Sequence, residues 1–189
     1  MKTRQSGMPE QERWDSYFNP EETLTSLGLT AQTGNTVDFG CGYGTFALPA
    51  ARRIRGTLYG YDIEPVMVEE CKRRAHAEGL SNTCFQVRDF VSDGTDLADD
   101  VADYVMLFNI LHCEEPYILL HEAYRILAPG GRVAIVHWNY DSTTPRGPSM
   151  DIRPRPEDCR RWLFRAGFTS SDDIINLPPY HYGLLGRKE

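Results

Sequence analysis

Short runs of apolar and β-branched residues alternate along the chain with longer segments whose apolar positions have helical spacing. The pattern predicts seven strands, at residues 36–39, 57–61, 83–87, 104–108, 132–137, 173–177 and 181–186. It predicts four helices between or after these strands, at residues 45–54, 65–78, 116–127 and 156–166. Strands that alternate with helices form mostly parallel sheets. The expected fold class is therefore α/β, with a doubly wound sheet.

Proline and short connections refine this prediction. Pro65, Pro116 and Pro156 each suit the first turn of a helix, where the missing N–H is not needed. Pro49 lies inside the predicted helix 45–54, so we expect a kink there. Residues 178–180 are too few for a crossover helix, so the last two strands must pair antiparallel.

The chain divides into a polar N-terminal part and one domain. Residues 1–18 are expected to be a flexible tail and a possible lid, and residues 19–189 form the domain. Asn19 and Pro20 predict a further helix that begins here and runs to about residue 27. Residues 139–155 predict a long, proline-rich loop, and loops of that length inside a compact domain are usually functional or disordered.

Composition excludes several classes of protein. The net charge of −7 makes nonspecific binding to nucleic acid or to an anionic membrane surface unlikely on electrostatic grounds. No apolar run has transmembrane length, and the polar first residues do not resemble a signal peptide. The five cysteines contain no Cys-x-x-Cys pair, so we expect neither a metal site nor a disulfide framework. Reduced thiols fit a cytoplasmic protein.

The most informative motif is a glycine-rich turn after the first predicted strand. Asp38 precedes Gly40, Gly42 and Gly44, and glycines at this spacing let a ligand approach main-chain N–H groups. A carboxylate at the start of the turn repels a pyrophosphate and attracts a cation. The expected ligand is therefore a nucleoside that carries positive charge, rather than a dinucleotide.

Polar residues also follow the next predicted strands, at the edge where doubly wound sheets bind ligands. Asp62 lies about 20 residues beyond the glycines, where a carboxylate holds ribose hydroxyls. Asp89 and Phe90 offer an acceptor for an exocyclic amine and an apolar face for a purine. Each acid alone also has a structural interpretation, as a turn former or a helix cap. Their joint occurrence at successive strand ends favours a ligand.

These residues make the chain similar to the small, single-domain class I S-adenosylmethionine-dependent methyltransferases. The resemblance runs from about Asn19 to the C-terminus and is strongest in Asp38-x-Gly40-x-Gly42-x-Gly44. It extends to the Pro-Gly-Gly turn at residues 129–131 and to the antiparallel last strand. The resemblance implies the Rossmann-like methyltransferase fold of seven strands, with S-adenosylmethionine as cofactor and S-adenosylhomocysteine as product.

The resemblance also implies a role for each matching residue. Asp38 would face the methionine ammonium group, Gly40 and Gly42 would allow close approach, and Asn109 would lie beside the methionine portion. On the nucleoside side, it assigns Asp62 to the ribose, Ile63 to packing on the adenine, Asp89 to the adenine amine and Phe90 to the face of the base.

The sequence indicates fewer residues for binding of the methyl acceptor. His112 and His137 follow the fourth and fifth predicted strands and are the candidate catalytic bases. Tyr17, Trp138 and Arg146 are candidate substrate contacts. Most of these have a structural alternative: His112 can pack at a helix start, Tyr17 can anchor the N-terminal helix, and Trp138 can cover the core. Arginines of this region can belong to a solvated helix face.

The favoured function is methyl transfer from S-adenosylmethionine to a small-molecule acceptor. An RNA or protein methyltransferase and a non-catalytic module that binds the nucleoside are the alternatives. A nicotinamide-dependent oxidoreductase is less favoured, because Asp38 precedes the glycines and Thr45 stands where the third glycine or alanine of a dinucleotide motif would fall. Neither the acceptor atom nor the oligomeric state follows from the sequence.

Overall fold

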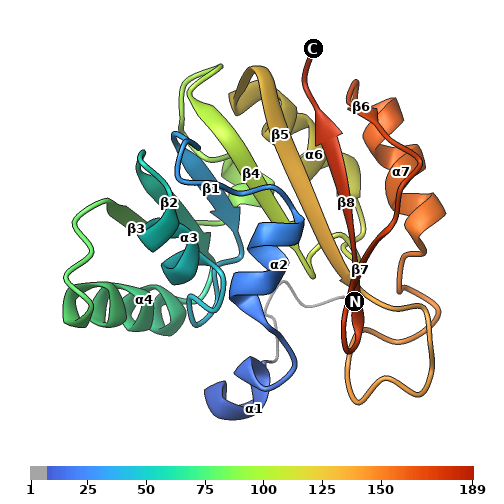
Figure 1. Ribbon diagram of the computed structural model, residues 1–189, viewed down its shortest axis with the longest axis horizontal. Helices are drawn as coiled ribbons and strands as arrows, with labels where there is room; N and C mark the ends of the chain where they lie inside the picture. The colour runs from blue at the N-terminus through green and yellow to red at the C-terminus, as the bar shows by residue number, and fades with distance from the viewer. Residues whose placement is uncertain (1–7) are drawn as a thin grey trace.

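A mixed eight-stranded sheet forms the centre of the protein in the computed structural model, which describes residues 8–189 (Figure 1). The strand order is β3-β2-β1-β4-β5-β8-β6, with β7 paired to β8 beside this path. The strands are β1 (Thr36–Phe39), β2 (Leu58–Asp62), β3 (Thr83–Val87), β4 (Ala102–Phe108), β5 (Leu127–Trp138), β6 (Thr169–Ser170), β7 (Ile175–Leu177) and β8 (His181–Arg187).

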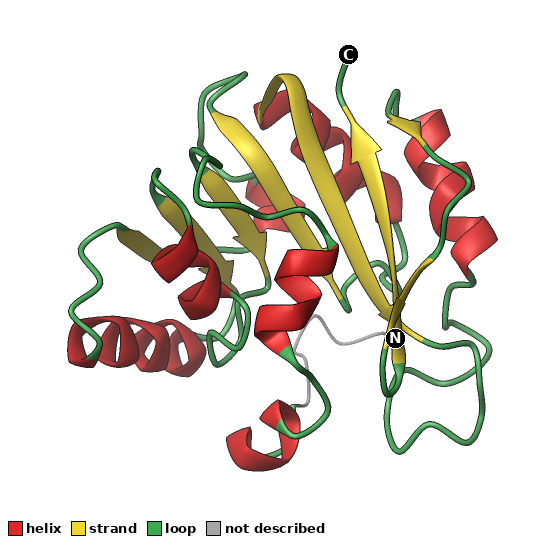
Figure 2. Cartoon of the chain, viewed as in Figure 1, coloured by secondary structure: helices red, strands yellow, loops and turns green. Residues whose placement is uncertain are grey.

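Helices cover both faces of this sheet, as Figure 2 shows. They are α1 (Gln11–Asp15), α2 (Pro20–Ser26), α3 (Ala47–Arg53), α4 (Pro65–Ala77), α5 (Phe90–Asp93), α6 (Pro116–Ile126) and α7 (Pro156–Arg165). One buried cluster joins α2, α3 and α4 to the sheet, and the other joins α5, α6 and α7 to its opposite face. Buried apolar side chains on both faces explain why the central strands are almost continuously hydrophobic.

The predicted fold is confirmed. The strands β1 to β5 pair in parallel, whereas β8 pairs antiparallel with β5, β6 and β7. The chain leaves β1 toward β2 on one side and later returns to β4 on the other, so the order reverses between β1 and β4. In open α/β sheets, ligands bind outside the carboxyl ends of the strands at such a switch point.

Three local predictions need correction. The kink expected at Pro49 does not occur, because α3 begins at Ala47 and places Pro49 in the first turn, where N–H groups have no helical partner. The strand predicted at 132–137 begins earlier, at Leu127, which pairs with Ala102 before a register shift. The sheet has eight strands rather than seven, because the two residues of β6 pair with the end of β8.

Two segments lie beyond the carboxyl ends of the parallel strands, at the bottom of Figure 1. One contains α1, which falls within the predicted tail; residues 1–7 of that tail lie outside the described residues. The other is the loop 139–155 between β5 and α7. Among residues 8–189, none of the helices has the length and apolar character needed to cross a membrane.

Candidate functional site

The turn after β1, which we call the glycine loop (residues 40–44), needs its glycines for conformation and for space. Gly40 and Gly42 have φ angles of 80° and 52°, which residues with a side chain rarely adopt. The loop is anchored to β2, because the N–H groups of Gly40 and Cys41 donate to the carbonyl of Tyr61 at 2.8 and 2.9 Å. A Cβ on Gly40 would lie only 3.0 Å from Cδ1 of Ile110.

A small cavity of about 30 Å³ lies above the glycine loop, at the switch point of the sheet. Four of the residues predicted to bind the cofactor line it together: Asp38, Gly40, Gly42 and Asn109. The other lining residues are Met8, Trp14, Cys41, Thr45, Phe46 and Phe108. The cavity is thus acidic at its base and apolar or aromatic around its walls.

Two buried carboxylates determine the charge of this region. Asp38 is 3% exposed, and burial followed by repulsion from Asp62 raises its pKa to about 7. Burial also raises the pKa of Asp62, although hydrogen bonds from the N–H groups of Glu64 and Gly42 oppose that rise. Neither acid forms a salt bridge within residues 8–189. A cation at this position would stabilise both ionised forms.

Asn109 supplies a second polar feature of the cavity. Its backbone is held in the left-handed region, at φ 54°, while its N–H donates to the carbonyl of Val136 at 2.7 Å. The side-chain oxygen and nitrogen are both buried and have no hydrogen-bond partner among the described residues. Buried polar atoms are usually satisfied, so this amide is poised to bond a ligand in the cavity.

The donor set therefore fits S-adenosylmethionine, which combines a cationic methionine end with a nucleoside. Asp38, an unpartnered amide and close-approach glycines converge on one cavity, whereas Asp62 lies outside its lining and bonds the N–H of Gly42. Its volume of about 30 Å³ is nevertheless far below the 300–1,000 Å³ or so of typical ligand sites. Residues of the N-terminal segment, Met8 and Trp14, take up part of the space.

The residues assigned to the adenine lie outside the cavity lining. Asp89 caps α5, with one carboxylate oxygen accepting hydrogen bonds from the N–H groups of Val91 and Ser92, both at 3.2 Å. Phe90 is buried and packs edge-on against Phe39, with ring centroids 5.2 Å apart. Ile63 is half-buried directly after Asp62. The chemistry of these residues for a purine stays a prediction.

The two candidate bases lie side by side. The rings of His112 and His137 have centroids 5.5 Å apart and are nearly perpendicular. His137 has no exposed surface, and neither ring nitrogen has a hydrogen-bond partner within residues 8–189. Burial, followed by the charges of His112, His181 and Arg153, lowers the pKa of His137 well below its ordinary value. His137 is therefore neutral at pH 7, while half-buried His112 is the more accessible of the two.

Tyr17 and Trp138, both candidate substrate contacts, belong to one buried aromatic cluster. Their ring centroids are 5.4 Å apart, and Tyr17 and Trp138 are 7% and 2% exposed. Trp138 also contacts Tyr180 and His181, with centroids at 6.2 and 4.2 Å. The cluster joins the segment before α2 to the end of β5 and the start of β8, so it fixes the start of α2 to the sheet.

Arg146 lies in the loop 139–155, whose shape depends on Arg153. The Arg153 side chain donates to the carbonyls of Asn139, Asp141 and Pro148 at 2.8–3.0 Å and to Oγ1 of Thr144 at 2.7 Å. Arg153 is only 7% exposed, so its charge stabilises the loop from inside. Arg146 is half-buried in the same loop, and its carbonyl accepts from Thr144 Oγ1 at 2.9 Å.

Sequence reasoning did not assign Met8, Thr45, Phe46 or Phe108 to the cavity. The sequence could have indicated the last three, because Thr45 and Phe46 directly follow the glycine loop and Phe108 ends β4. The sequence could not have indicated Met8, because only the folded chain brings it beside Gly42.

Comparison with known proteins identifies the family. The model of the methyltransferase domain matches residues 36–131, which is half of the chain. Aklanonic acid methyltransferase DauC of Streptomyces sp. (strain C5) is 34% identical over 62% of this chain and 54% of its own length. The chloroplastic tocopherol O-methyltransferase of Arabidopsis thaliana is 26% identical over 85% of this chain and 48% of its own length. The chain thus spans about half the length of these two relatives.

A solved structure supports the same conclusion about the fold. A SAM-dependent methyltransferase from Aquifex aeolicus superposes with a TM-score of 0.81 at 22% identity, over 94% of this chain and 93% of that one. The cofactor predicted from the motifs, S-adenosylmethionine, is the cofactor of this family. The chain belongs to the methyltransferase domain family, and so to the class I S-adenosylmethionine-dependent methyltransferases.

Proposed function

We propose that the protein transfers a methyl group from S-adenosylmethionine to a small-molecule acceptor. The observation that carries this proposal is the convergence of the buried Asp38 carboxylate, an unpartnered amide and the glycine loop on one cavity at the switch point of the sheet, with Asp62 bonded to the N–H of Gly42 beside it. When bound, the cofactor supplies an electrophilic methyl group on a positively charged sulfur.

The residues around the cavity suit binding and orientation of such a cofactor. Asp38 and Asp62 provide negative charge that favours a cationic ligand. A bound cation would stabilise the ionised form of Asp38 most, because its carboxyl is the more deeply buried. The amide of Asn109 can bond the polar methionine end. Phe46 and Phe108, whose ring centroids are 4.9 Å apart, form an apolar wall that keeps water out.

A base is needed only for an acceptor that must lose a proton. His112 is then the better candidate to take that proton, because it is partly exposed whereas His137 is enclosed. His137 lies against the ring of His112 and would orient it. We assign Arg146 to the acceptor side as well, because it lies in the loop beyond β5.

A small molecule is the preferred acceptor for two reasons. The two named relatives act, by their names, on aklanonic acid and on tocopherol. The net charge of −7 also disfavours a polyanionic substrate such as RNA.

Calorimetry separates the competing classes of function. The proposal expects S-adenosylhomocysteine to bind the wild-type protein with a micromolar or tighter Kd, and expects NAD not to bind. Asp38→Ala is expected to weaken S-adenosylhomocysteine binding by about tenfold or more, the effect of losing one charged contact. Binding of NAD without binding of S-adenosylhomocysteine would contradict the proposal.

The acceptor class needs a separate experiment. A panel of phenols, carboxylic acids and amines is incubated with S-adenosylmethionine, and formation of S-adenosylhomocysteine is followed by mass spectrometry, with Asp38→Ala as the control of reduced cofactor affinity. Turnover with at least one small molecule is expected. Turnover only with RNA or protein added to the same assay would reassign the acceptor.

A further inference from the structure

The N-terminal segment Met8–Asp15, which we call the strap, lies against the glycine loop. The hydroxyl of Tyr43 donates to the carbonyl of Pro9 at 3.1 Å, and the hydroxyl of Thr45 donates to the Asp15 carboxylate at 2.6 Å. Both ends of the strap are therefore attached to residues of the glycine loop or directly after it.

Between these attachments, the side chain of Met8 enters the cofactor cavity. Its sulfur and terminal methyl group lie 3.1 Å from the position that a Cβ on Gly42 would occupy. Met8 and Trp14 line the cavity together with Asp38 and Asn109. A thioether of the strap thus lies in the part of the site where the methionine end of the cofactor is expected.

The remaining space does not admit the cofactor. The cavity measures about 30 Å³, room for about two water molecules. Sites for ligands of cofactor size measure about 300–1,000 Å³. Rotation of one side chain does not supply the missing volume, so the strap as a whole must move before the cofactor enters.

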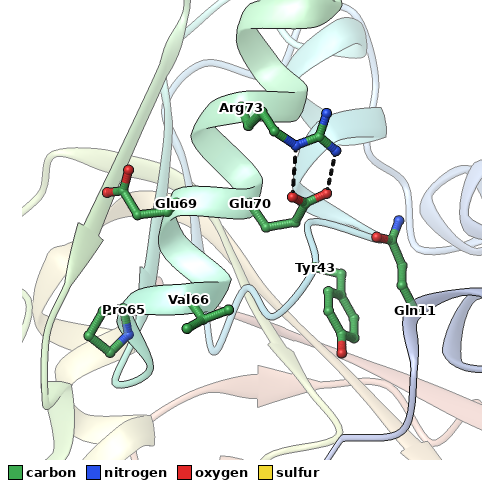
Figure 3. A pocket seen from close by; sticks show the side chains of 7 residues that line it. All are labelled: Gln11, Tyr43, Pro65, Val66, Glu69, Glu70 and Arg73. Atoms are coloured by element: carbon green, nitrogen blue, oxygen red, sulfur yellow. Dashed lines mark hydrogen bonds and ion pairs between the residues drawn. The ribbon is translucent and has the colours of Figure 1, made fainter.

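The strap is built so that it can move without disturbing the core. Within it, α1 contains no buried residue. A groove of about 590 Å³ lies between α1 and α4, lined by residues that include Gln11, Tyr43 and Val66 (Figure 3). The displacement ends at Tyr17, because that residue is buried against Trp138.

We propose that the strap is a gate, in which Met8 closes the cofactor cavity and must leave it for the cofactor to bind. This inference rests on the proposed function. Closed protein cannot bind, so the apparent affinity equals the intrinsic affinity multiplied by the open fraction. Loosening the strap should therefore tighten cofactor binding, opposite to the effect of removing an ordinary binding residue.

The first test compares Met8→Ala with the wild-type protein and with Met150→Ala, a matched control in the loop 139–155. S-adenosylhomocysteine is the probe, with Kd from calorimetry and association rates from stopped-flow fluorescence. Met8→Ala is expected to bind about fivefold to twentyfold more tightly and to associate faster, while Met150→Ala resembles wild type. Tyr43→Phe, which removes the bond to Pro9, should change both values in the same direction but less.

The second test follows the strap itself. Arg13 is exposed in α1, so trypsin cleavage after it reports strap release, with the N-terminal fragment detected by mass spectrometry. Saturating S-adenosylhomocysteine should speed this cleavage severalfold in the wild-type protein. Slower cleavage would mean that the strap closes over the bound ligand, and would overturn the gate.

The two tests distinguish failure of the gate from failure of the function. If all variants bind S-adenosylhomocysteine but Met8→Ala binds no tighter and no faster, the gate is wrong and the proposed function stands. If no variant binds S-adenosylhomocysteine, both proposals are wrong.

Discussion

Asp62 accepts a hydrogen bond of 2.9 Å from the backbone N–H of Gly42, which ties the end of β2 to the glycine loop. Its other oxygen accepts from the N–H of Glu64 at 3.0 Å. The sequence predicts a ligand-binding role for Asp62, and the structure adds a role in shaping the loop. The two roles are compatible, because a carboxylate has about four acceptor positions.

Replacing Asp62 should therefore affect both folding and binding. Asp62→Ala leaves the N–H of Gly42 without its partner in a buried position, and should lower the free energy of unfolding by about 1–3 kcal/mol. Asp62→Asn keeps one acceptor oxygen and should lose less stability, yet should still weaken S-adenosylhomocysteine binding because the negative charge is gone. Denaturant unfolding and calorimetry on both variants separate these effects. Equal stability of Ala and Asn variants would contradict the loop-shaping role.

The pKa of Asp38 predicts a pH dependence of cofactor binding. Burial and Asp62 raise this pKa to about 7, so the carboxyl is largely protonated below pH 7 in the free protein. The ammonium group of the ligand prefers the ionised form of Asp38, so binding should release a proton and weaken as the pH falls below about 7, by up to about tenfold per unit. Calorimetry with S-adenosylhomocysteine between pH 5.5 and 8.5 measures this slope.

Asp38→Asn is the control for that dependence. It has no proton to lose at this position, so its affinity should be lower at pH 8 but nearly constant below pH 7. A slope below pH 7 that is the same in Asp38→Asn and in the wild-type protein would assign the titration to another group.

His181 predicts a pH dependence of stability. Burial, followed by the charge of Arg153, lowers its pKa from 6.5 to about 3. The folded chain therefore binds fewer protons than the unfolded chain between these values, and stability is lost as the pH falls below 6.5. His181→Phe keeps an aromatic ring beside Phe18 and Trp138 but cannot be charged. Between pH 7 and pH 5 it should lose about 1–2 kcal/mol less stability than the wild-type protein.

Urea unfolding at several pH values checks this expectation. His76→Gln serves as the matched control, because His76 is exposed on α4 and should show the wild-type pH dependence. The expectation is wrong if His181→Phe and His76→Gln lose the same stability between pH 7 and pH 5.

Arg153 should control the order of the loop 139–155. Its guanidinium group bonds carbonyls from three separate points of that loop, so Arg153→Met removes all of these bonds at once. Hydrogen exchange in residues 139–152 should become at least about tenfold faster, with a loss of about 1–3 kcal/mol in stability. Arg165→Ala, which changes an exposed arginine of α7, should leave the loop unchanged. Unchanged exchange in Arg153→Met would show that the loop is held by other contacts.

The sequence predicts those parts of the site that depend on neighbouring residues. The motif from Asp38 to Gly44 lies within one turn, so its geometry follows from local constraints on backbone conformation. Asp62 could be placed because it ends the adjacent parallel strand. The fold was predictable for the same reason, since alternation of strands and helices restricts the topology.

The sequence does not predict contacts that depend on long-range packing. Met8 reaches Gly42 only because α1 turns back over the glycine loop, and no periodic pattern marks five residues as a helix. The aromatic cluster of Tyr17 and Trp138 joins segments that are far apart in the chain. Polarity alone therefore could not separate residues that face a ligand from residues that fill the interior.

Asn109 provides the sharpest test of the cofactor site, because its backbone and its amide can be changed separately. At φ 54°, the left-handed conformation costs Ala about 1–2 kcal/mol, whereas Gly adopts it freely and Asn tolerates it better than Ala does. Both variants lose the unpartnered amide that faces the cavity. If the amide bonds the cofactor, both should bind S-adenosylhomocysteine about tenfold more weakly, while only the Ala variant loses stability. If the backbone alone makes the contact, Asn109→Gly should bind like the wild-type protein. Calorimetry and thermal unfolding of the two variants decide between these contacts, because each predicts a different affinity for a protein of unchanged stability.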